Sequence, residues 1–171
     1  GSDDVPADAV AVVDGTVITQ AQLDDLLSRA KKSYASQKRE FPKAGTSEYT
    51  ALQNQAVAYL VQREEYVNEA ESLDVTVTPA QIDKRVKEVT TQYFAGDKAK
   101  LAAQLKQQGY DDAAFREEMR AFFTTQVPER IRSVVAERRE LSKDDIVETQ
   151  RILNAAGLAV PKLASAQAFP E

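Results

Sequence analysis

Five pairs of adjacent carboxylates that follow the polar start are the first residues in this 171-residue chain whose type and spacing could do chemistry. Two carboxylates held together can share a proton for acid–base catalysis or bind a divalent metal ion. Neighbouring residues of a helix point about 100° apart, however, so an adjacent pair does not converge on one site. Asp111 and Asp144 also stand where helices are expected to begin, and carboxylates there interact favourably with the helix dipole. We therefore interpret all five pairs as structural. They are Asp24-Asp25, Glu64-Glu65, Asp111-Asp112, Glu117-Glu118 and Asp144-Asp145.

Two residue types that carry much of enzyme chemistry are missing, because the chain has no histidine and no cysteine. Their absence excludes thiol catalysis, disulfide bonds, zinc fingers and Ser-His-Asp triads. The six glycines are scattered and form no dinucleotide-binding G-x-G-x-x-G motif. We therefore predict no catalytic residue, no cofactor, no metal site and no enzyme activity. The remaining enzyme hypothesis is a carboxylate enzyme using magnesium, which requires side chains from different helices to converge in a cleft.

The charge balance argues against a nucleic-acid partner. Lysine and arginine total 22 and aspartate and glutamate 27, for a net charge of -5, whereas binding to nucleic acid depends on an excess of cationic side chains. A group of four arginines could meet an anionic partner, but interleaved glutamates favour a solvated helix face. These arginines are Arg130, Arg132, Arg138 and Arg139. No apolar run approaches the ~18 residues of a membrane span, so we expect membrane association only through an anchor outside this sequence.

The densest run of large apolar residues predicts either a binding surface or a core. Phe115, Met119, Phe122 and Phe123 recur at helical spacing, and a flexible methionine among aromatic rings suits a surface that accepts varied apolar ligands. The same spacing is typical of a helix face buried in a core. Phe41 and Tyr49 flank an expected loop, and we expect them to be accessible. These six residues are the candidate peptide-binding residues.

The predicted elements that position these side chains are mostly helices. Residues 9–13 and 16–18 are β-prone and enclose Asp14-Gly15, the favoured two-residue hairpin turn. A helix capped by Thr19 and Gln22 is expected to run to about Glu40, and a second from Thr46 or Ser47 to about Leu73. The chain therefore predicts an all-α domain with a small N-terminal β-hairpin.

Further helices follow an extended link at 74–77. Thr78, Pro79 and Gln81 form the strongest helix start in the chain. That helix is expected to bury Tyr93 on its apolar face and to stop at Gly96. A short helix capped by Asp97 is then expected to end at Gly109, and another to open at Asp111, with a break or kink at Pro128. A continuing helical stripe is expected to bear Ile131, Val134 and Val135. A last helix is expected from Ser142 to Gly157, and the tail from Leu158 is expected to be irregular, with 158–160 able to pair with the hairpin edge.

Three segments in order resemble one known family, the SurA/PrsA-type extracytoplasmic foldases. Residues 10–19 (VAVVDGTVIT) are similar to the family's A-x-V-N/D-G-x-x-I-T opening, and residues 70–83 (AESLDVTVTPAQID) to its link between helices. Residues 105–111, leading into Phe115-Arg116 and Met119-Arg120, are similar to its L-x-x-x-G-x-T/D … F-R-x-x-I/L-R step. The resemblance covers roughly residues 9–145.

That resemblance implies a helical chaperone module that holds unfolded exported proteins without ATP. Family members often carry an inserted parvulin-type prolyl isomerase domain rich in histidine, but this chain has no histidine and no room for that domain. The resemblance therefore implies a holding module without isomerase activity, whose partners are unfolded or extended polypeptide clients. It also implies an extracytoplasmic location, with a signal peptide or lipid anchor that lies outside this sequence.

Domain boundaries follow from the same patterns. We expect a flexible start at residues 1–8, the SurA-like helical domain at 9–157 and a tail at 158–171. The alternative hypothesis is a structural helical domain that forms a homodimer or docks one specific partner, because long helices with few glycines suit that role equally well.

Overall fold

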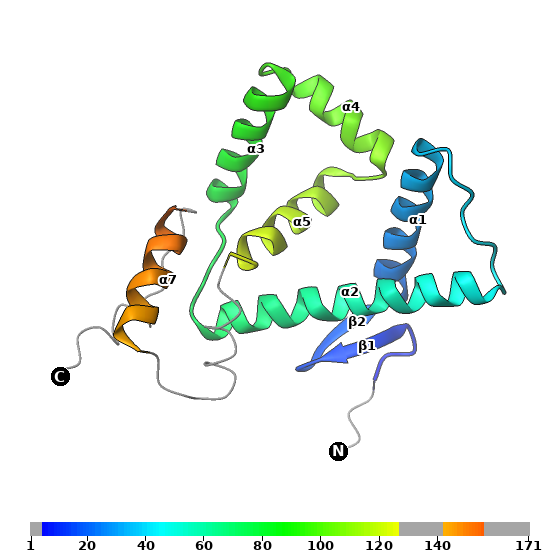
Figure 1. Ribbon diagram of the computed structural model, residues 1–171, viewed down its shortest axis with the longest axis horizontal. Helices are drawn as coiled ribbons and strands as arrows, with labels where there is room; N and C mark the ends of the chain where they lie inside the picture. Colours follow the sequence, from blue (N-terminus) through cyan, green and yellow to red (C-terminus); the bar gives the residue numbers. More distant parts are fainter. Residues whose placement is uncertain (1–4, 127–141, 156–171) are drawn as a thin grey trace. The chain divides into compact units, whose positions relative to one another are not determined.

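The structure is a computed structural model and describes residues 5–126 and 142–155 (Figure 1). Over these residues it is all-α with one two-stranded antiparallel sheet, which confirms the predicted fold class. The strands are β1 (Ala9–Val13) and β2 (Thr16–Thr19). The helices are α1 (Gln20–Ser36), α2 (Ser47–Ser72), α3 (Pro79–Phe94), α4 (Lys98–Gln108), α5 (Asp112–Thr124) and α7 (Lys143–Ala155). Several of the predicted features lie outside the described residues. They are the arginine group at 130–139, the break at Pro128, the helical stripe at 131–135, the helix end at Gly157 and the tail from Leu158.

The hairpin forms where the Asp-Gly pair predicts it. Asp14 and Gly15 both have positive φ angles, 47° and 82°, as a two-residue turn that follows the twist of the strands requires. Val13 pairs with Thr16 next to the turn, and the register shifts between Ala9 and Ala11.

Two capping boxes fix the starts of α1 and α3. The Thr78 hydroxyl accepts a hydrogen bond from the Gln81 backbone N–H at 3.2 Å, and the Gln81 side chain accepts one from the Thr78 N–H at 2.8 Å. Thr19 and Gln22 exchange the same pair of bonds at 3.2 and 2.9 Å. Each box satisfies two backbone donors that a helix start would otherwise leave without partners.

Two details of the predicted helices are wrong. The first helix ends at Ser36 and not near Glu40, because Lys38 takes a left-handed conformation with φ 55° and ends the helix. Tyr93 does not lie on a buried face, since it is 68% exposed. The buried positions of α3 are Ile82 and Thr90. Tyr93 follows Ile82 by 11 residues, about three turns, so the two residues lie on nearly the same side of α3. The burial of that side does not extend to the last turn, which ends at Phe94, and the spacing of apolar residues does not contain that information.

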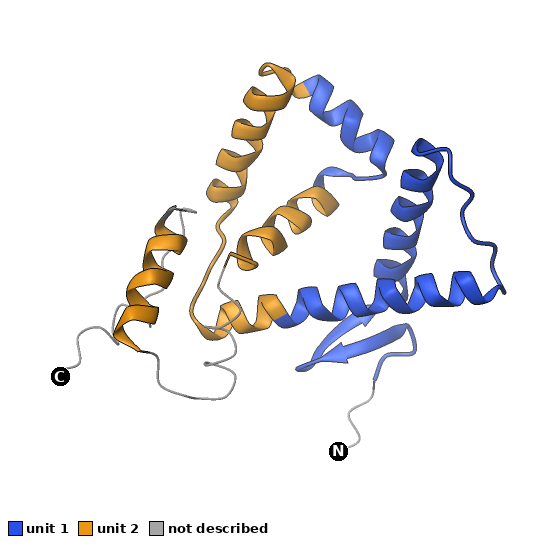
Figure 2. Ribbon diagram, viewed as in Figure 1, with its two compact units in different colours: residues 1–65, 99–112 blue, residues 66–98, 113–171 orange. Residues whose placement is uncertain are grey.

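The chain divides into two compact units, and α2 contributes residues to both (Figure 2). Unit 1 is residues 1–65 and 99–112, and unit 2 is residues 66–98 and 113–171. The core of unit 1 joins the hairpin to α1 and the first part of α2. Its buried members are Val13, Ile18, Leu23, Leu27, Ala56 and Leu60. A two-stranded hairpin alone is marginal in water, and these contacts are what hold it.

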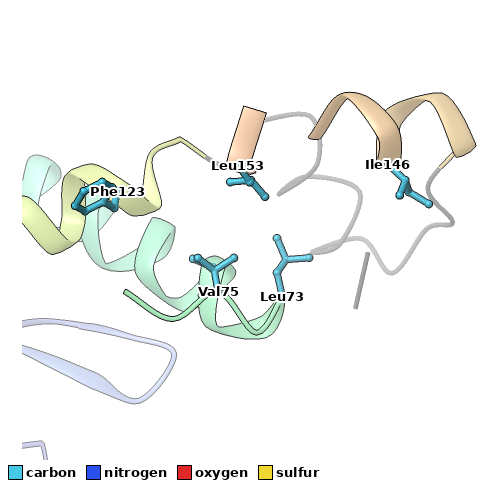
Figure 3. Close-up of a cluster of buried hydrophobic side chains, with 6 residues drawn as sticks. Leu73, Val75, Phe123, Ile146 and Leu153 are labelled. Atoms are coloured by element: carbon cyan, nitrogen blue, oxygen red, sulfur yellow. The ribbon is translucent and has the colours of Figure 1, made fainter. Parts of the chain in front are cut away.

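Unit 2 has its own core, to which α2, the 74–77 link, α5 and α7 all contribute (Figure 3). Val77 and Met119 pack against it. The buried members are Ala70, Leu73, Val75, Phe123, Ile146 and Leu153. An ion pair between Arg116 and Asp83, with N and O 2.6 Å apart, also joins α5 to α3. Both groups are well exposed, so this pair contributes little to stability.

The buried polar side chains of the described residues are three threonines, each satisfied within its own helix. Thr90 donates its hydroxyl to the Val86 carbonyl at 2.7 Å, and Thr149 donates to the Asp145 carbonyl at 2.7 Å. Thr124 donates to the Ala121 carbonyl at the same distance. Because each hydroxyl keeps a partner, burial costs little.

Gly109 holds the end of α4 against α1, and its replacement tests that contact. Its φ is 88°, and a Cβ there would lie 3.1 Å from Lys32 Cδ and 3.2 Å from Arg29 Cγ. We expect Gly109→Ala to lower the free energy of unfolding by about 1–2 kcal/mol, mainly through the backbone. Urea unfolding followed by circular dichroism measures this.

Gly15→Ala is the matched control, because Gly15 has nearly the same φ, 82°, with nothing within 4 Å of its Cβ position. Any excess cost at Gly109 over Gly15 reports the crowding against α1. A Gly109→Ala protein as stable as the wild type would contradict the close approach.

Candidate functional site

An open pocket of about 510 Å³ lies in unit 1 beside the loop that joins α1 to α2. Apolar side chains and the carbon chains of two lysines make up most of its wall. Its lining residues are Asp24, Leu27, Ser28, Lys31, Phe41, Pro42, Lys43, Ala44 and Tyr49. We call this site the aromatic pocket.

Helix α1 supplies one wall of the aromatic pocket through a single face. Asp24, Leu27, Ser28 and Lys31 are spaced at i, i+3, i+4 and i+7, so they lie on one side of the helix. Leu27 is also a buried member of the unit 1 core. The pocket wall is therefore continuous with the core and is as firmly held as α1 itself.

Hydrogen bonds hold the loop from residue 37 to residue 46 at both ends. At the end of α1, the Arg39 N–H donates to the Tyr34 carbonyl at 2.9 Å, and the Lys38 N–H donates to the Ala35 carbonyl at 3.0 Å. This pattern is a Schellman motif, which usually includes a contact between the same two side chains. Here the Arg39 guanidinium lies over the Tyr34 ring, 4.4 Å from its centroid.

The start of α2 closes the other end of the loop. The Thr46 hydroxyl donates to the Lys43 carbonyl at 2.6 Å and accepts from the Tyr49 N–H at 3.2 Å. The loop is thus fixed by hydrogen bonds at both ends, backbone–backbone bonds after α1 and bonds of the Thr46 hydroxyl before α2, which favours a preformed site.

Three aromatic rings meet in series beside this loop. The Phe41 ring is edge-on to Tyr34, with centroids 5.3 Å apart at 81°, and edge-on to Tyr49, at 6.3 Å and 79°. All three side chains are half-buried. Edge-to-face pairs are the favoured arrangement of aromatic rings, so Phe41 is held from two sides while part of it faces the pocket.

Two of the six candidate binding residues, Phe41 and Tyr49, thus line the aromatic pocket of unit 1, and the other four belong to unit 2. In unit 2, Phe123 is 7% exposed and belongs to the core, and Met119 packs against that core. Phe115 is half-buried, whereas Phe122 is 48% exposed. Because adjacent helical residues point about 100° apart, Phe122 and Phe123 cannot share one face. The four residues therefore do not form one apolar face. Phe123 is buried in the core, as the core interpretation predicts, and Phe122 is exposed.

The sequence reasoning missed Leu27, Lys31, Pro42 and Lys43 as residues of one site. The i, i+3, i+4, i+7 spacing on α1 was a usable signal for the first two. Nothing in the sequence showed that the loop after Ser36 folds back against that face, because this depends on the left-handed turn at Lys38.

The described residues hold no group of three carboxylates that could bind a metal ion. Within the same residues, no helix is both long and apolar enough to cross a membrane.

Comparison with known proteins shows the family to which this chain is similar. A family model described as the SurA-like N-terminal domain matches residues 1–127, and these residues contain the hairpin, both capping boxes and the aromatic pocket. The chain belongs to this family. The match confirms the resemblance carried by residues 10–19, 70–83 and 105–120, all of which lie inside the matched range.

The SurA-like chain is also related to a chaperone. It is 27% identical over 148 residues to Chaperone SurA of Pseudoalteromonas translucida (strain TAC 125), which covers 86% of this chain. The chain spans about a third, 32%, of the length of that relative. No solved structure matches this chain.

Proposed function

We propose that this SurA-like chain is an ATP-independent, extracytoplasmic holding chaperone that binds extended apolar segments of unfolded exported proteins. The observation that carries the proposal is a preformed aromatic pocket in a chain of a chaperone-related family. Phe41 and Tyr49 are the proposed contact residues of unit 1. Phe122, with the partly exposed sides of Phe115 and Met119, is the proposed second contact surface in unit 2.

The size of the pocket suits weak and general binding. A pocket of about 510 Å³ accepts one or two large side chains, and burying one such side chain contributes roughly 1.5–3 kcal/mol. The ordering of a disordered client offsets much of that gain. The affinity expected for one segment is therefore micromolar or weaker, which allows release without ATP.

We also propose that the chain holds its clients without isomerising prolyl bonds. The pocket offers no imidazole and no thiol, since the chain lacks histidine and cysteine. The relationship to a chaperone supports the binding role and not a chemical one.

Light scattering of a chemically unfolded client diluted into buffer tests the proposal. We expect the chain at several-fold molar excess to suppress aggregation in the absence of any nucleotide. Unchanged scattering at that excess would contradict the holding function. A mass that rises with protein concentration, together with no effect on the client, would instead support the homodimer.

A further inference from the structure

The aromatic pocket is bordered by a basic stretch in an otherwise acidic chain. Residues 31–43 contain five cationic side chains and one carboxylate, Glu40, a net charge of +4, whereas the whole chain carries -5. The cationic residues are Lys31, Lys32, Lys38, Arg39 and Lys43. A local field of this sign, opposite to that of the rest of the molecule, attracts anionic groups to the pocket.

Two of these cations line the pocket itself. Lys31 projects from α1 and Lys43 from the loop, and both side chains are exposed. Over residues 5–126 and 142–155, neither ammonium group has a carboxylate partner. The one lining carboxylate, Asp24, accepts a hydrogen bond from the Gln20 side chain at 2.9 Å.

We propose that the aromatic pocket selects client segments in which a carboxylate stands near a large apolar residue. This inference rests on the proposed function and names the class of client. The apolar side chain enters the aromatic pocket beside Phe41 and Tyr49, and the carboxylate pairs with Lys31 or Lys43. In an extended segment the residues two positions away point to the same side as the apolar one, so they carry the carboxylate toward the lysines.

A polypeptide fits these observations better than an anionic membrane surface. A helix that lies on a membrane needs an apolar face free to enter the lipid. On α1 the apolar face is occupied, because Leu23 and Leu27 are buried in the unit 1 core. The lysines therefore border a concave site of side-chain size and not an insertable helix face.

A matched pair of labelled peptides tests the selection by fluorescence anisotropy with the full 171-residue chain. Both are extended glycine–serine peptides with a central phenylalanine. One has glutamate two positions to either side, and its twin has lysine there. We expect tighter binding of the glutamate peptide at low salt and a smaller difference at about 1 M salt, where the Debye length is ~3 Å. The overall charge of -5 favours the lysine twin, so preference for glutamate requires the local basic site.

The double variant K31Q/K43Q should weaken the glutamate peptide roughly three- to tenfold and leave the lysine twin unchanged or tighter. K84Q/K87Q is the matched control, because it removes two exposed lysines from α3 in unit 2. It should leave the difference between the peptides intact.

Three results would overturn the inference. The first is equal binding of the two peptides, and if Phe41→Ala still weakens both, the holding function stands without charge selection. The second is binding to vesicles of equal parts phosphatidylcholine and phosphatidylserine that K31Q/K43Q weakens, together with equal binding of the two peptides. That result would assign the lysines to a lipid surface. The third is binding of neither peptide, and the light-scattering assay then reports separately on the holding function.

Discussion

Replacing Leu153 by alanine is expected to lower the free energy of unfolding by about 2–5 kcal/mol, the range for removing a leucine side chain from a packed core. Leu153 is 0% exposed and lies on α7 in the same cluster as Leu73 and Phe123 (Figure 3). Urea unfolding followed by circular dichroism measures the loss. The expected effect is large because the cavity would open where three separate segments of unit 2 meet.

Val147→Ala is the control on the same helix. Val147 is 54% exposed, so its replacement should change the free energy of unfolding by no more than about 0.5 kcal/mol. Equal effects at the two positions would show that α7 does not belong to the unit 2 core. The result matters for the family as well, because α7 lies beyond the matched residues 1–127.

The double variant F41A/Y49A is expected to lose most of the suppression of client aggregation. It removes two rings that line the aromatic pocket and make an edge-to-face pair. Losing the apolar contact of even one large side chain costs roughly 1.5–3 kcal/mol, so about tenfold more protein or greater should be needed for the same effect. Light scattering against protein concentration gives this ratio.

Its control is Y93A/V147A, which removes two exposed large side chains of unit 2 that belong to neither proposed contact surface. This control should keep at least the larger part of the activity. If it fails and F41A/Y49A does not, the binding surface lies in unit 2 and the aromatic pocket is not the principal site. Circular dichroism and the unfolding midpoint of each variant separate lost binding from lost folding, and Phe41→Leu, which keeps an apolar side chain, should retain part of the activity.

Local signals predicted the element starts and the turns well. Asp14-Gly15 predicted the hairpin turn, and Thr78 with Gln81 predicted the start of α3. Both predictions were possible because each motif involves residues no more than three positions apart. The same devices carry much of the family resemblance. A hydrogen bond between such near neighbours depends on little beyond the local residue types, so it can be read from them.

Contacts between distant segments were less predictable. The burial of Phe123 beside an exposed Phe122 depends on where α7 and the end of α2 pack, and spacing within α5 does not contain that information. The end of α1 at Ser36 was also missed. Lys38 takes a left-handed conformation there, and this conformation is predictable from sequence mainly when the residue is glycine.

The amino-acid order alone therefore established the helical class, the hairpin, the family and the lack of thiol or imidazole chemistry. Tertiary structure alone decided that Phe41, Tyr49 and the α1 face form one pocket, and that Lys31 and Lys43 border it. The physical reason is that capping and turn energies arise from residues a few positions apart. A pocket forms only when side chains from distant parts of the chain pack together, and its lining is the set of side chains that this packing leaves partly exposed.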